Sequence, residues 1–373
     1  MALNDLVDKI NKEYGTVVFT GKLPSKERIP FSSPYLNYVT YGGVCYGASS
    51  EFVGAESSGK TTLVLDIIKN FQKIEDEHYQ EEMAKLKVAF EKAKPKDAEK
   101  IASEMRSLVK RKAVYLDIEF SLEPEWMEKL GVNPDDVIVI QPDAMGVETP
   151  MNWIVDMAKT GEIGLIVIDS VGSMISDAEE DKDIGEATYG GVSKSLTRFY
   201  KKIMATVKKN RIALIIINQT RADMNNPYNR FNRPGGQMNK FAQSLTLGLS
   251  EGEKLDEKYA EATSKSEMIF ARMTNVQMIK NKTAPPDRQR TRFTILYGKG
   301  IDVAYDVFCM AGDMGMVMVS GAYYTYIEPV TGEELIKVQG KSKAVAYLRD
   351  NPSLLDKLWH AMYEKSGTEE QTE

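Results

Sequence analysis

One stretch of the chain has the residue types and spacing of a phosphate-binding loop. GAESSGKT, at 54–61, fits GxxxxGK[ST], in which Gly54 and Gly59 let backbone N–H groups converge on phosphate oxygens. Lys60 can reach the β- and γ-phosphates of a nucleoside triphosphate, and the Thr61 hydroxyl can ligate Mg²⁺. An ordinary glycine turn is disfavoured because a strand-like run precedes the loop and a helix-like run follows it. We therefore expect ATP and Mg²⁺ as cofactors, with the nucleotide held by Gly54, Glu56, Ser57, Ser58, Gly59, Lys60, Thr61 and Thr62.

Polar residues at the ends of later apolar runs could act beside this loop. Asp169 ends LIVID, and although such an Asp often caps a helix, a phosphate loop nearby favours a magnesium ligand. Glu119 ends YLDIE and could orient an attacking water, but Asp117 lies on the same side of a strand, and spacing does not choose between them. Gln219 ends IIINQ, where its amide could sense the γ-phosphate or simply begin a turn.

These residues can act together only if a fold brings the ends of several strands close to one another. The apolar runs predict such a fold. Short runs alternating with helical segments indicate a mainly parallel sheet covered on both faces, and ligands bind such sheets at the carboxyl ends of the strands. The expected strands are 49–53, 113–120, 136–143, 164–171 and 212–219, followed by 244–251, one ending at Lys282, and 291–298. A small mixed α/β tail domain is expected over 303–373.

Residues 72–112 interrupt this alternation with a Glu- and Lys-rich segment broken at Pro95. Sparse apolar stripes predict a helical hairpin inserted after the first core helix, and they lie at Met83, Leu86 and Phe90, then Ile101, Met105 and Leu108. A solvated decoration is the favoured interpretation, and a partner-binding arm is the alternative.

The first residues predict a short helix with one apolar stripe. Leu3, Leu6, Val7 and Ile10 recur at helical spacing, so this helix needs a surface to cover it. The stripe could pack on its own domain or dock on a neighbouring subunit, and the sequence leaves both open.

Composition excludes several classes of protein. With 42% hydrophobic and 27% charged residues, no apolar run of about 18 residues and an N-terminus unlike a signal peptide, the chain is expected to be soluble and cytoplasmic, without a membrane partner. Two cysteines and two histidines support neither a disulfide framework nor a zinc cluster. The net charge of −6 counts only weakly against nucleic acid, because binding depends on where the charge lies.

Together the motifs resemble those of the RecA family of DNA recombinases. GAESSGKTT, YLDIEFSLEPEWMEKLGV, VIDSV, IINQTR, MIKNKTAPP and ILYGKGID stand in the family's order from about Ile29 onward, over roughly nine-tenths of the chain. The resemblance implies an α/β RecA-like P-loop NTPase core at 29–302, an N-terminal docking helix and strand at 1–28, and a small α/β C-terminal domain at 303–373.

The resemblance also implies roles for residues around the nucleotide. It assigns catalysis to Glu119 rather than Asp117, makes Gln219 the γ-phosphate sensor and gives Lys60 its phosphate contact. Glu123, Trp126 and Tyr297 fall where the family contacts adenine, with Trp at a position that is usually Tyr. Lys280 and Lys282 match paired lysines that reach the γ-phosphate bound by the adjacent protomer, and their spacing puts both on one face of a strand.

The DNA-contacting positions depart most from the family. The first loop matches at 184–191, the second spans 220–236, and the expected contacts are Tyr189, Lys194, Lys201, Arg221, Tyr228, Arg230, Phe231, Arg233, Gly235 and Gly236. The implied function is strand exchange between single-stranded DNA and a homologous duplex, by a helical filament with DNA-stimulated ATP hydrolysis. Single-strand binding and mediator proteins are implied partners. A hexameric helicase motor and a non-catalytic accessory protein are the alternatives.

Overall fold

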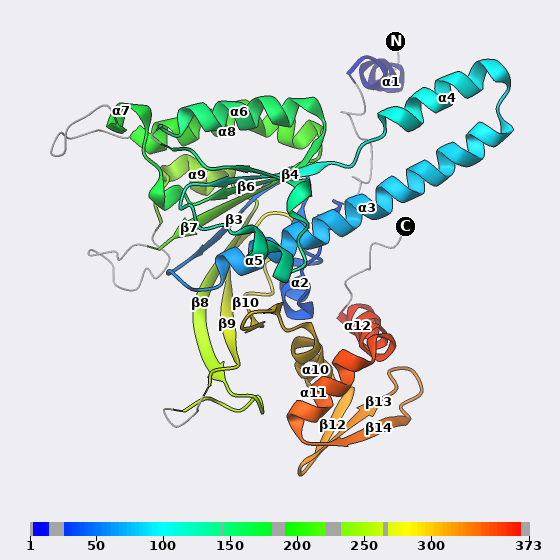
Figure 1. Ribbon diagram of the computed structural model, residues 1–373, viewed down its shortest axis with the longest axis vertical. Helices are drawn as coiled ribbons and strands as arrows, with labels where there is room; N and C mark the ends of the chain where they lie inside the picture. Colours follow the sequence, from blue (N-terminus) through cyan, green and yellow to red (C-terminus); the bar gives the residue numbers. More distant parts are fainter. Residues whose placement is uncertain are drawn as a thin grey trace.

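The computed structural model describes residues 3–14, 26–143, 145–180, 191–220, 233–263 and 268–366. Over these residues a nine-stranded sheet forms the centre of the molecule, with the strand order β11-β10-β9-β8-β3-β7-β6-β4-β5 (Figure 1). Its strands are β3 (Ala48–Gly54), β4 (Lys112–Asp117), β5 (Val137–Ile140), β6 (Ile163–Asp169), β7 (Ala213–Gln219), β8 (Leu245–Leu255), β9 (Ala271–Asn281), β10 (Arg290–Leu296) and β11 (Gly300–Ile301).

The sheet is parallel from β8 through β3, β7, β6 and β4 to β5, whereas β9, β10 and β11 run antiparallel. This confirms the expected mainly parallel sheet. Every residue of β3 and of β6 is buried, as expected for strands covered on both faces. The register aligns Gly54 with Gln219 and Asp117 with Asp169, so the strands carrying the candidate site end at one edge of the sheet.

Helices cover the two faces of the parallel part and form two apolar clusters with it. The first cluster packs α3 (Lys60–Lys92) and α5 (Pro124–Lys129) on one face. The second packs α6 (Glu148–Thr160) and α8 (Gly191–Lys209) on the other, with α9 (Gly236–Ala242) beside them (Figure 1). The short elements η2 (Val171–Ser173) and α7 (Asp177–Glu180) lie on this side, whereas η1 (Pro134–Asp136) lies beside α5.

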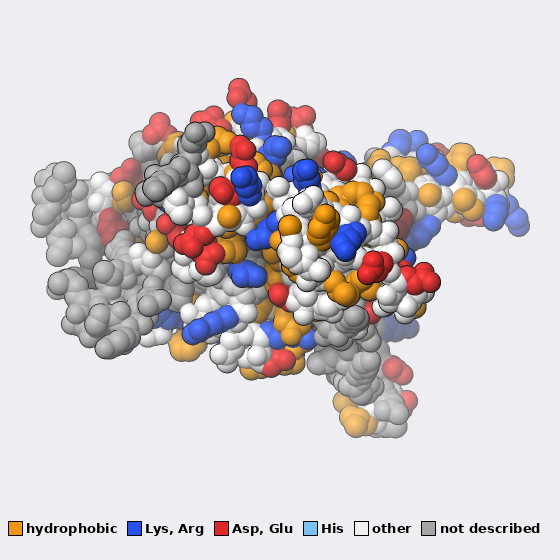
Figure 2. All heavy atoms as spheres, turned by 90° about the horizontal axis from the view of Figure 1, so that it is seen from below, with side chains coloured by type: hydrophobic (Ala, Val, Ile, Leu, Met, Phe, Trp, Pro, Cys, Tyr) orange, Lys and Arg blue, Asp and Glu red, His pale blue; other side chains and the backbone are white. Residues whose placement is uncertain are grey.

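The helix after the phosphate loop is longer than the core helix expected from the sequence. α3 continues without a break for 33 residues, so its outer part is itself the first arm of a hairpin, and α4 (Pro95–Ser107) is the second arm. No residue of α4 is buried, while Val88 and Phe90 of α3 are exposed. The hairpin projects from the body with apolar, basic and acidic side chains on its surface (Figure 2). Helix propensity carries α3 past the sheet because no Gly or Pro intervenes before Pro95.

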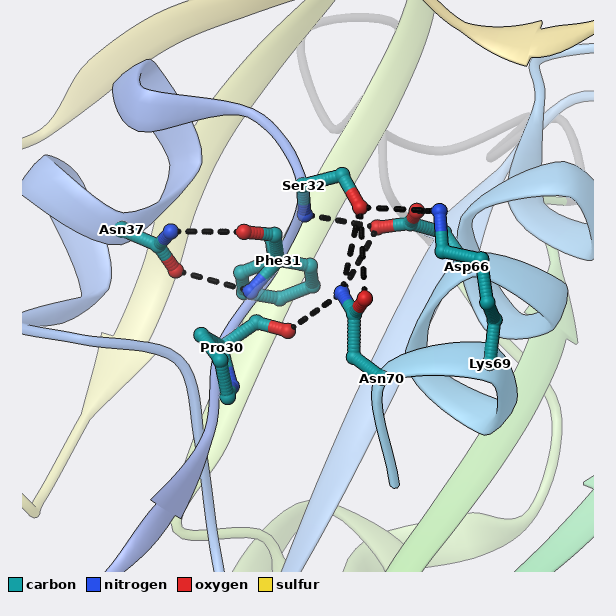
Figure 3. A network of polar contacts seen from close by, with 7 residues as sticks. All are labelled: Pro30, Phe31, Ser32, Asn37, Asp66, Lys69 and Asn70. Atoms are coloured by element: carbon teal, nitrogen blue, oxygen red, sulfur yellow. Dashed lines mark hydrogen bonds and ion pairs between the residues drawn. The ribbon is translucent and has the colours of Figure 1, made fainter. Parts of the chain in front are cut away.

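A polar network fastens the segment before the sheet to α3. β1 (Arg28–Ile29) pairs with β2 (Val44–Cys45), and α2 (Pro34–Thr40) lies between them. The carboxylate of Asp66 on α3 accepts from Ser32 N at 2.8 Å and pairs with Lys69 Nζ at 2.7 Å (Figure 3). Asn70 donates to the carbonyl of Pro30 at 2.8 Å. These contacts satisfy the Ser32 amide and the Pro30 carbonyl in the backbone that leads into α2. Upstream, α1 (Leu3–Tyr14) leaves Leu3 and Leu6 exposed.

The C-terminal region packs as one cluster with the edge of the sheet. Leu255, Ala271 and Leu296 of the sheet join residues of this region in a single buried cluster, so the boundary expected at 303 falls inside continuous packing. The region contains α10 (Val303–Asp313), β12 (Val317–Ser320), β13 (Tyr323–Ile327), β14 (Glu334–Gln339), α11 (Lys341–Asp350) and α12 (Pro352–Ser366). Its three strands form a separate antiparallel sheet.

A buried carboxylate of α10 makes the stability of this junction sensitive to pH. Asp306 accepts from Ser33 Oγ at 2.6 Å, and burial raises its pKa from 3.8 to about 7. Between those values the unfolded chain releases a proton that the folded chain retains, so the contribution of Asp306 to stability is fully present below pH 4 and is lost as the pH rises to about 7. We expect Asp306→Asn to flatten this part of the profile and to raise the melting temperature at pH 8. Thermal unfolding from pH 5 to 8 measures the effect, with exposed Asp156→Asn as control, and profiles that stay parallel to the wild type would contradict it.

Within the described ranges, the structure contains no helix that could serve as a transmembrane span.

Candidate nucleotide site and DNA-facing surface

The phosphate loop leaves β3 in a shape that its glycines permit. A Cβ on Gly54 would lie 2.4 Å from the carbonyl oxygen of Leu249, so only glycine fits where β3 passes β8. Gly59, at φ 93°, precedes α3 directly, and a Cβ there would press against Ile295. The N-terminus of α3 therefore opens at the loop, with its first N–H groups and its dipole available to an anion.

Lys60 is held inside this loop. Its ammonium group donates to the carbonyl oxygens of Gly54 at 3.1 Å and Ala55 at 2.7 Å. Burial lowers the pKa of Lys60, while the charges of Asp169 and Glu119 raise it. The lysine thus lies within electrostatic reach of both carboxylates proposed from the sequence, which brings the three side chains to one place at the edge of the sheet.

A hollow of about 200 Å³ adjoins the loop. Its walls include Trp126 of α5 and Tyr297 after β10, which fits a flat aromatic base, whereas Glu123, the exposed residue before α5, does not line it. The sequence missed Arg272 of β9, which is 6% exposed, lines the hollow and pairs with Glu251 at 2.5 Å. Its Nε has no hydrogen-bond partner among the described residues. The sequence signal for it was an arginine within the strand-like run ARMTNV. The loop residues in the walls are Ser57, Ser58, Gly59, Lys60, Thr61 and Thr62.

Asp169 lies at the end of β6, is 3% exposed and interacts electrostatically with Lys60. It accepts from Tyr115 Oη at 2.6 Å, and burial raises its pKa to about 6 while that hydrogen bond lowers it. The peptide bond to Ser170 is cis. A carboxylate at this strand end and the Thr61 hydroxyl in the loop wall are oxygen donors of the kind that suits Mg²⁺. No cluster of three His, Cys, Asp or Glu residues suitable for a metal occurs among the described residues, so water and phosphate oxygens would complete the coordination.

Glu119 and Asp117 differ in their surroundings. β4 ends at Asp117, not at Glu119 as expected. Asp117 is fully buried and accepts from the amides of Ser121 and Leu122 at 3.2 and 3.0 Å, which stabilises the turn after β4. Glu119 lies two residues beyond the strand and is exposed. The geometry therefore gives Asp117 a structural task and leaves Glu119 available to a water molecule.

Hydroxyl and amide groups hold the Glu119 carboxylate. Its Oε1 accepts from Ser170 Oγ at 2.6 Å, Ser173 Oγ at 2.9 Å and Gln219 Nε2 at 2.8 Å. The sequence placed Glu119 and Gln219 at strand ends, but nothing in it indicated that the two side chains touch or that the serines join them. All three donors bind Oε1, and together they hold the carboxylate in one orientation.

Comparison with known proteins identifies the chain. The RecA N-terminal domain family matches residues 97–302, more than half of the chain. The chain belongs to the RecA family. The protein RecA of Streptomyces avermitilis is 31% identical over 98% of this chain and 85% of its own length, and that of Aquifex aeolicus is 30% identical over 98% and 93%. The solved RadB recombinase is 18% identical with a TM-score of 0.47, covering 72% of this chain and 95% of its own.

In this RecA family chain, the paired lysines lie together on the far side of β8. Lys280 of β9 donates to the carbonyl oxygen of Lys240 at 2.5 Å, and Lys282, one residue past β9, donates to that of Phe241 at 3.4 Å. Burial and the charge of Lys282 lower the pKa of Lys280 to about 8. Both ammonium groups thus gather at the C-terminus of α9, which fits their expected position on one face, and neither lines the hollow beside the phosphate loop.

The residues of α8 that are expected to contact DNA belong to a basic stripe, which contains one cation more than the family resemblance indicated. Lys194 and Lys201 are exposed, and Arg198 lies between them on the same face, so the three cations recur at helical spacing. The sequence missed Arg198, although the spacing of Lys194, Arg198 and Lys201 was visible in it. Tyr189, Arg221, Tyr228, Arg230 and Phe231 lie outside the described residues.

The C-terminal end of the second loop is described and is tightly built. Gly235 and Gly236 take φ values of 101° and 72°, in the left-handed region, and Gly235 caps α9. Arg233, expected on the DNA-contacting surface, instead lies 2.8 Å from a carboxylate oxygen of Glu51, with 8% and 0% of the two side chains exposed. The glycines thus shape the backbone of the loop end, and Arg233 points toward the sheet.

Proposed function

We propose that this RecA family protein is a DNA-dependent ATPase that forms helical filaments on single-stranded DNA and pairs that strand with a homologous duplex for strand exchange. The observation that carries the proposal is the 2.8 Å hydrogen bond from Gln219 to Glu119. Gln219 ends β7 and is the residue before the loop that we assign to DNA, so one side chain joins the hydrolytic carboxylate to the DNA-facing segment. A change at the nucleotide can therefore reach DNA through a single residue.

The residues around the hollow divide the work of binding and hydrolysis. The loop N–H groups and Lys60 hold the triphosphate, while Trp126 and Tyr297 hold the base. Thr61 and Asp169 would hold Mg²⁺, which neutralises charge on the phosphate oxygens. Glu119 orients the attacking water and accepts its proton. Gln219 contacts the γ-phosphate, and hydrolysis releases that contact.

DNA contact is proposed for two neighbouring segments. Lys194, Arg198 and Lys201 on α8 would meet backbone phosphates, because such contacts need charge and carry no sequence preference. Aromatic side chains in the loops, Tyr189, Tyr228 and Phe231, would stack on bases. Arg221 and Arg230 would add charge. The partners are single-stranded DNA, homologous duplex DNA and further copies of the chain, with single-strand binding and mediator proteins acting alongside.

Two measurements test the proposal. Single-stranded DNA should stimulate ATP hydrolysis, and electron micrographs with an unhydrolysable ATP analogue should show elongated filaments. Closed rings with strand unwinding would favour a hexameric helicase motor instead. Intact ATP binding without any stimulation by DNA would contradict the proposal and favour an accessory protein.

The α8 stripe gives a graded expectation for DNA affinity. Changing Lys194, Arg198 and Lys201 to Gln, one at a time, should weaken binding of single-stranded DNA and lower the slope of log K against log salt by about 0.7 per lost phosphate contact. Lys209→Gln, a cation at the other end of the same helix, is the matched control. Fluorescence anisotropy at several salt concentrations measures both quantities, and unchanged slopes in all three variants would remove α8 from the DNA surface.

A further inference from the structure

A polar cluster is buried in the sheet beneath α9, where an apolar core is expected. Ser49 and Glu51 of β3 face this side, and β3 supplies no residue to the apolar cluster formed here by the other strands and α8. Glu51 is fully buried. Its Oε1 accepts from Asn218 at 3.0 Å and from Asn239 at 2.8 Å, and its Oε2 lies 2.8 Å from Arg233 Nε.

Further hydrogen bonds extend the cluster into α8 and α9. Asn239 accepts from Tyr200 Oη at 2.6 Å and from Gln243 at 2.8 Å, and Gln243 accepts from Ser49 Oγ at 2.6 Å. Three buried atoms here, Glu51 Oε2, Asn218 Oδ1 and Arg233 Nε, make no hydrogen bond with the described residues, so Arg233 meets the carboxylate as a charge rather than as a hydrogen-bond donor. The hydrogen bonds that do form link β3, β7, α8 and α9 and restrict how these elements can move relative to one another.

Within this cluster Arg233 provides the matching positive charge. Burial raises the pKa of Glu51, and the charge of Arg233 lowers it. An ionised carboxylate at this depth is costly unless a cation and hydrogen bonds compensate it, and removing one partner of such a pair leaves the other charge uncompensated. The ionised form of Glu51 is therefore stable in the folded protein only while Arg233 lies beside it.

We propose that Glu51 and Arg233 form a buried latch that positions α9 and the end of β7, and that Arg233 is a positioning residue rather than a DNA contact. This inference rests on the proposed function, because it concerns how the nucleotide and DNA segments are held together. Arg233 immediately precedes Pro234, whose carbonyl oxygen accepts from Asn218 at 3.0 Å. Asn218 adjoins Gln219, so the latch fixes the backbone that carries the proposed γ-phosphate sensor.

The same latch reaches the paired lysines through the sheet and through α9. Glu51 pairs in register with Thr246 of β8, which pairs with Lys280 of β9, so the carboxylate and the lysine lie on one line across the sheet. Asn239 sits in the middle of α9, and Lys280 bonds the carbonyl of the next residue, Lys240. Moving α9 would displace Gln219 and Lys280 together, although they lie on different strands.

A charge-removal series separates a latch from a phosphate contact. Arg233→Gln leaves Glu51 without its counter-charge, whereas the double variant with Glu51→Gln removes both charges and keeps an amide that Asn218 and Asn239 can still bond. If Arg233 acts through Glu51, the second change repairs the first. If Arg233 contacts DNA, the double variant stays as weak as Arg233→Gln.

Hydrogen exchange of the α9 amides in the DNA-free protein is the first readout. We expect Arg233→Gln to speed exchange over Gly236–Ala242 about tenfold, and the double variant to return within about twofold of the wild type. Affinity for a single-stranded oligonucleotide should follow the same order, with the salt slope unchanged. Exchange that stays at the wild-type rate in Arg233→Gln, or a salt slope lower by about 0.7 in both variants, would overturn the latch.

Folding failure does not leave the question open. If Arg233→Gln does not fold, a folded double variant supports the latch by rescue, and a double variant that also fails to fold overturns it. If the wild type neither binds DNA nor hydrolyses ATP, the proposed function fails, while the exchange rates of α9 still decide whether the pair holds the helix.

Discussion

Changing Lys280 and Lys282 together to Ala should lower DNA-stimulated ATP turnover by about 10³-fold or more, because cations supplied to a transferring phosphoryl group from a neighbouring subunit are worth about 10³–10⁵ in rate. In the single chain these ammonium groups lie at the end of α9 and away from the hollow that adjoins the phosphate loop, so they have no triphosphate of their own to contact. Turnover by steady-state phosphate release measures the loss, with exposed Lys254→Ala as the control.

A mixing experiment tests whether the lysines act across an interface. Protein carrying the two lysine changes is combined with protein carrying Glu119→Gln, each inactive by itself. At some interfaces the lysine variant supplies the phosphate loop and Glu119, and the Glu119→Gln variant supplies the paired lysines. The site at such an interface contains the native residue at all three positions. Random 1:1 assembly should therefore restore about one quarter of wild-type turnover. Turnover that stays at the level of the separate variants would show that the lysines do not act in trans.

Glu119→Gln alone should lower turnover by about 10²–10⁴-fold while ATP binding and DNA binding persist. The amide keeps the volume and can still accept from Ser170, Ser173 and Gln219, but it cannot take a proton. Nucleotide affinity by a fluorescent ATP analogue and turnover by phosphate release separate binding from chemistry. Glu125→Gln, an exposed carboxylate on α5, is the control. Near-normal turnover in Glu119→Gln would remove Glu119 from the catalytic role.

The position of Glu119 illustrates what spacing could and could not decide. Its distance from Asp117 placed both carboxylates on one side of a presumed strand, and the family resemblance chose Glu119. The structure adds a physical reason for that choice, because β4 ends at Asp117 and the buried Asp117 is occupied by backbone amides. Strand ends are set by where the hydrogen-bond ladder stops, which the apolar pattern locates only approximately.

For Arg233, in contrast, the structure differs from what the sequence suggested. In the sequence it is one of several arginines in a polar loop, and its charge suggested a DNA contact. In the structure it lies against Glu51, which is 182 residues earlier in the chain and belongs to β3, the middle strand of the sheet. The available signal was a Glu in an otherwise strand-like run, SSEFV, which demands a partner once that strand is buried.

By itself, the sequence determined the phosphate loop, the mainly parallel sheet and the strand ends that carry Asp169 and Gln219, because these depend on local spacing and on periodic burial. Only the tertiary structure decided which side chains meet: Gln219 with Glu119, Arg233 with Glu51, and the paired lysines with the end of α9. Those contacts join segments far apart in the chain, and they follow from strand order and helix packing, which no local pattern encodes.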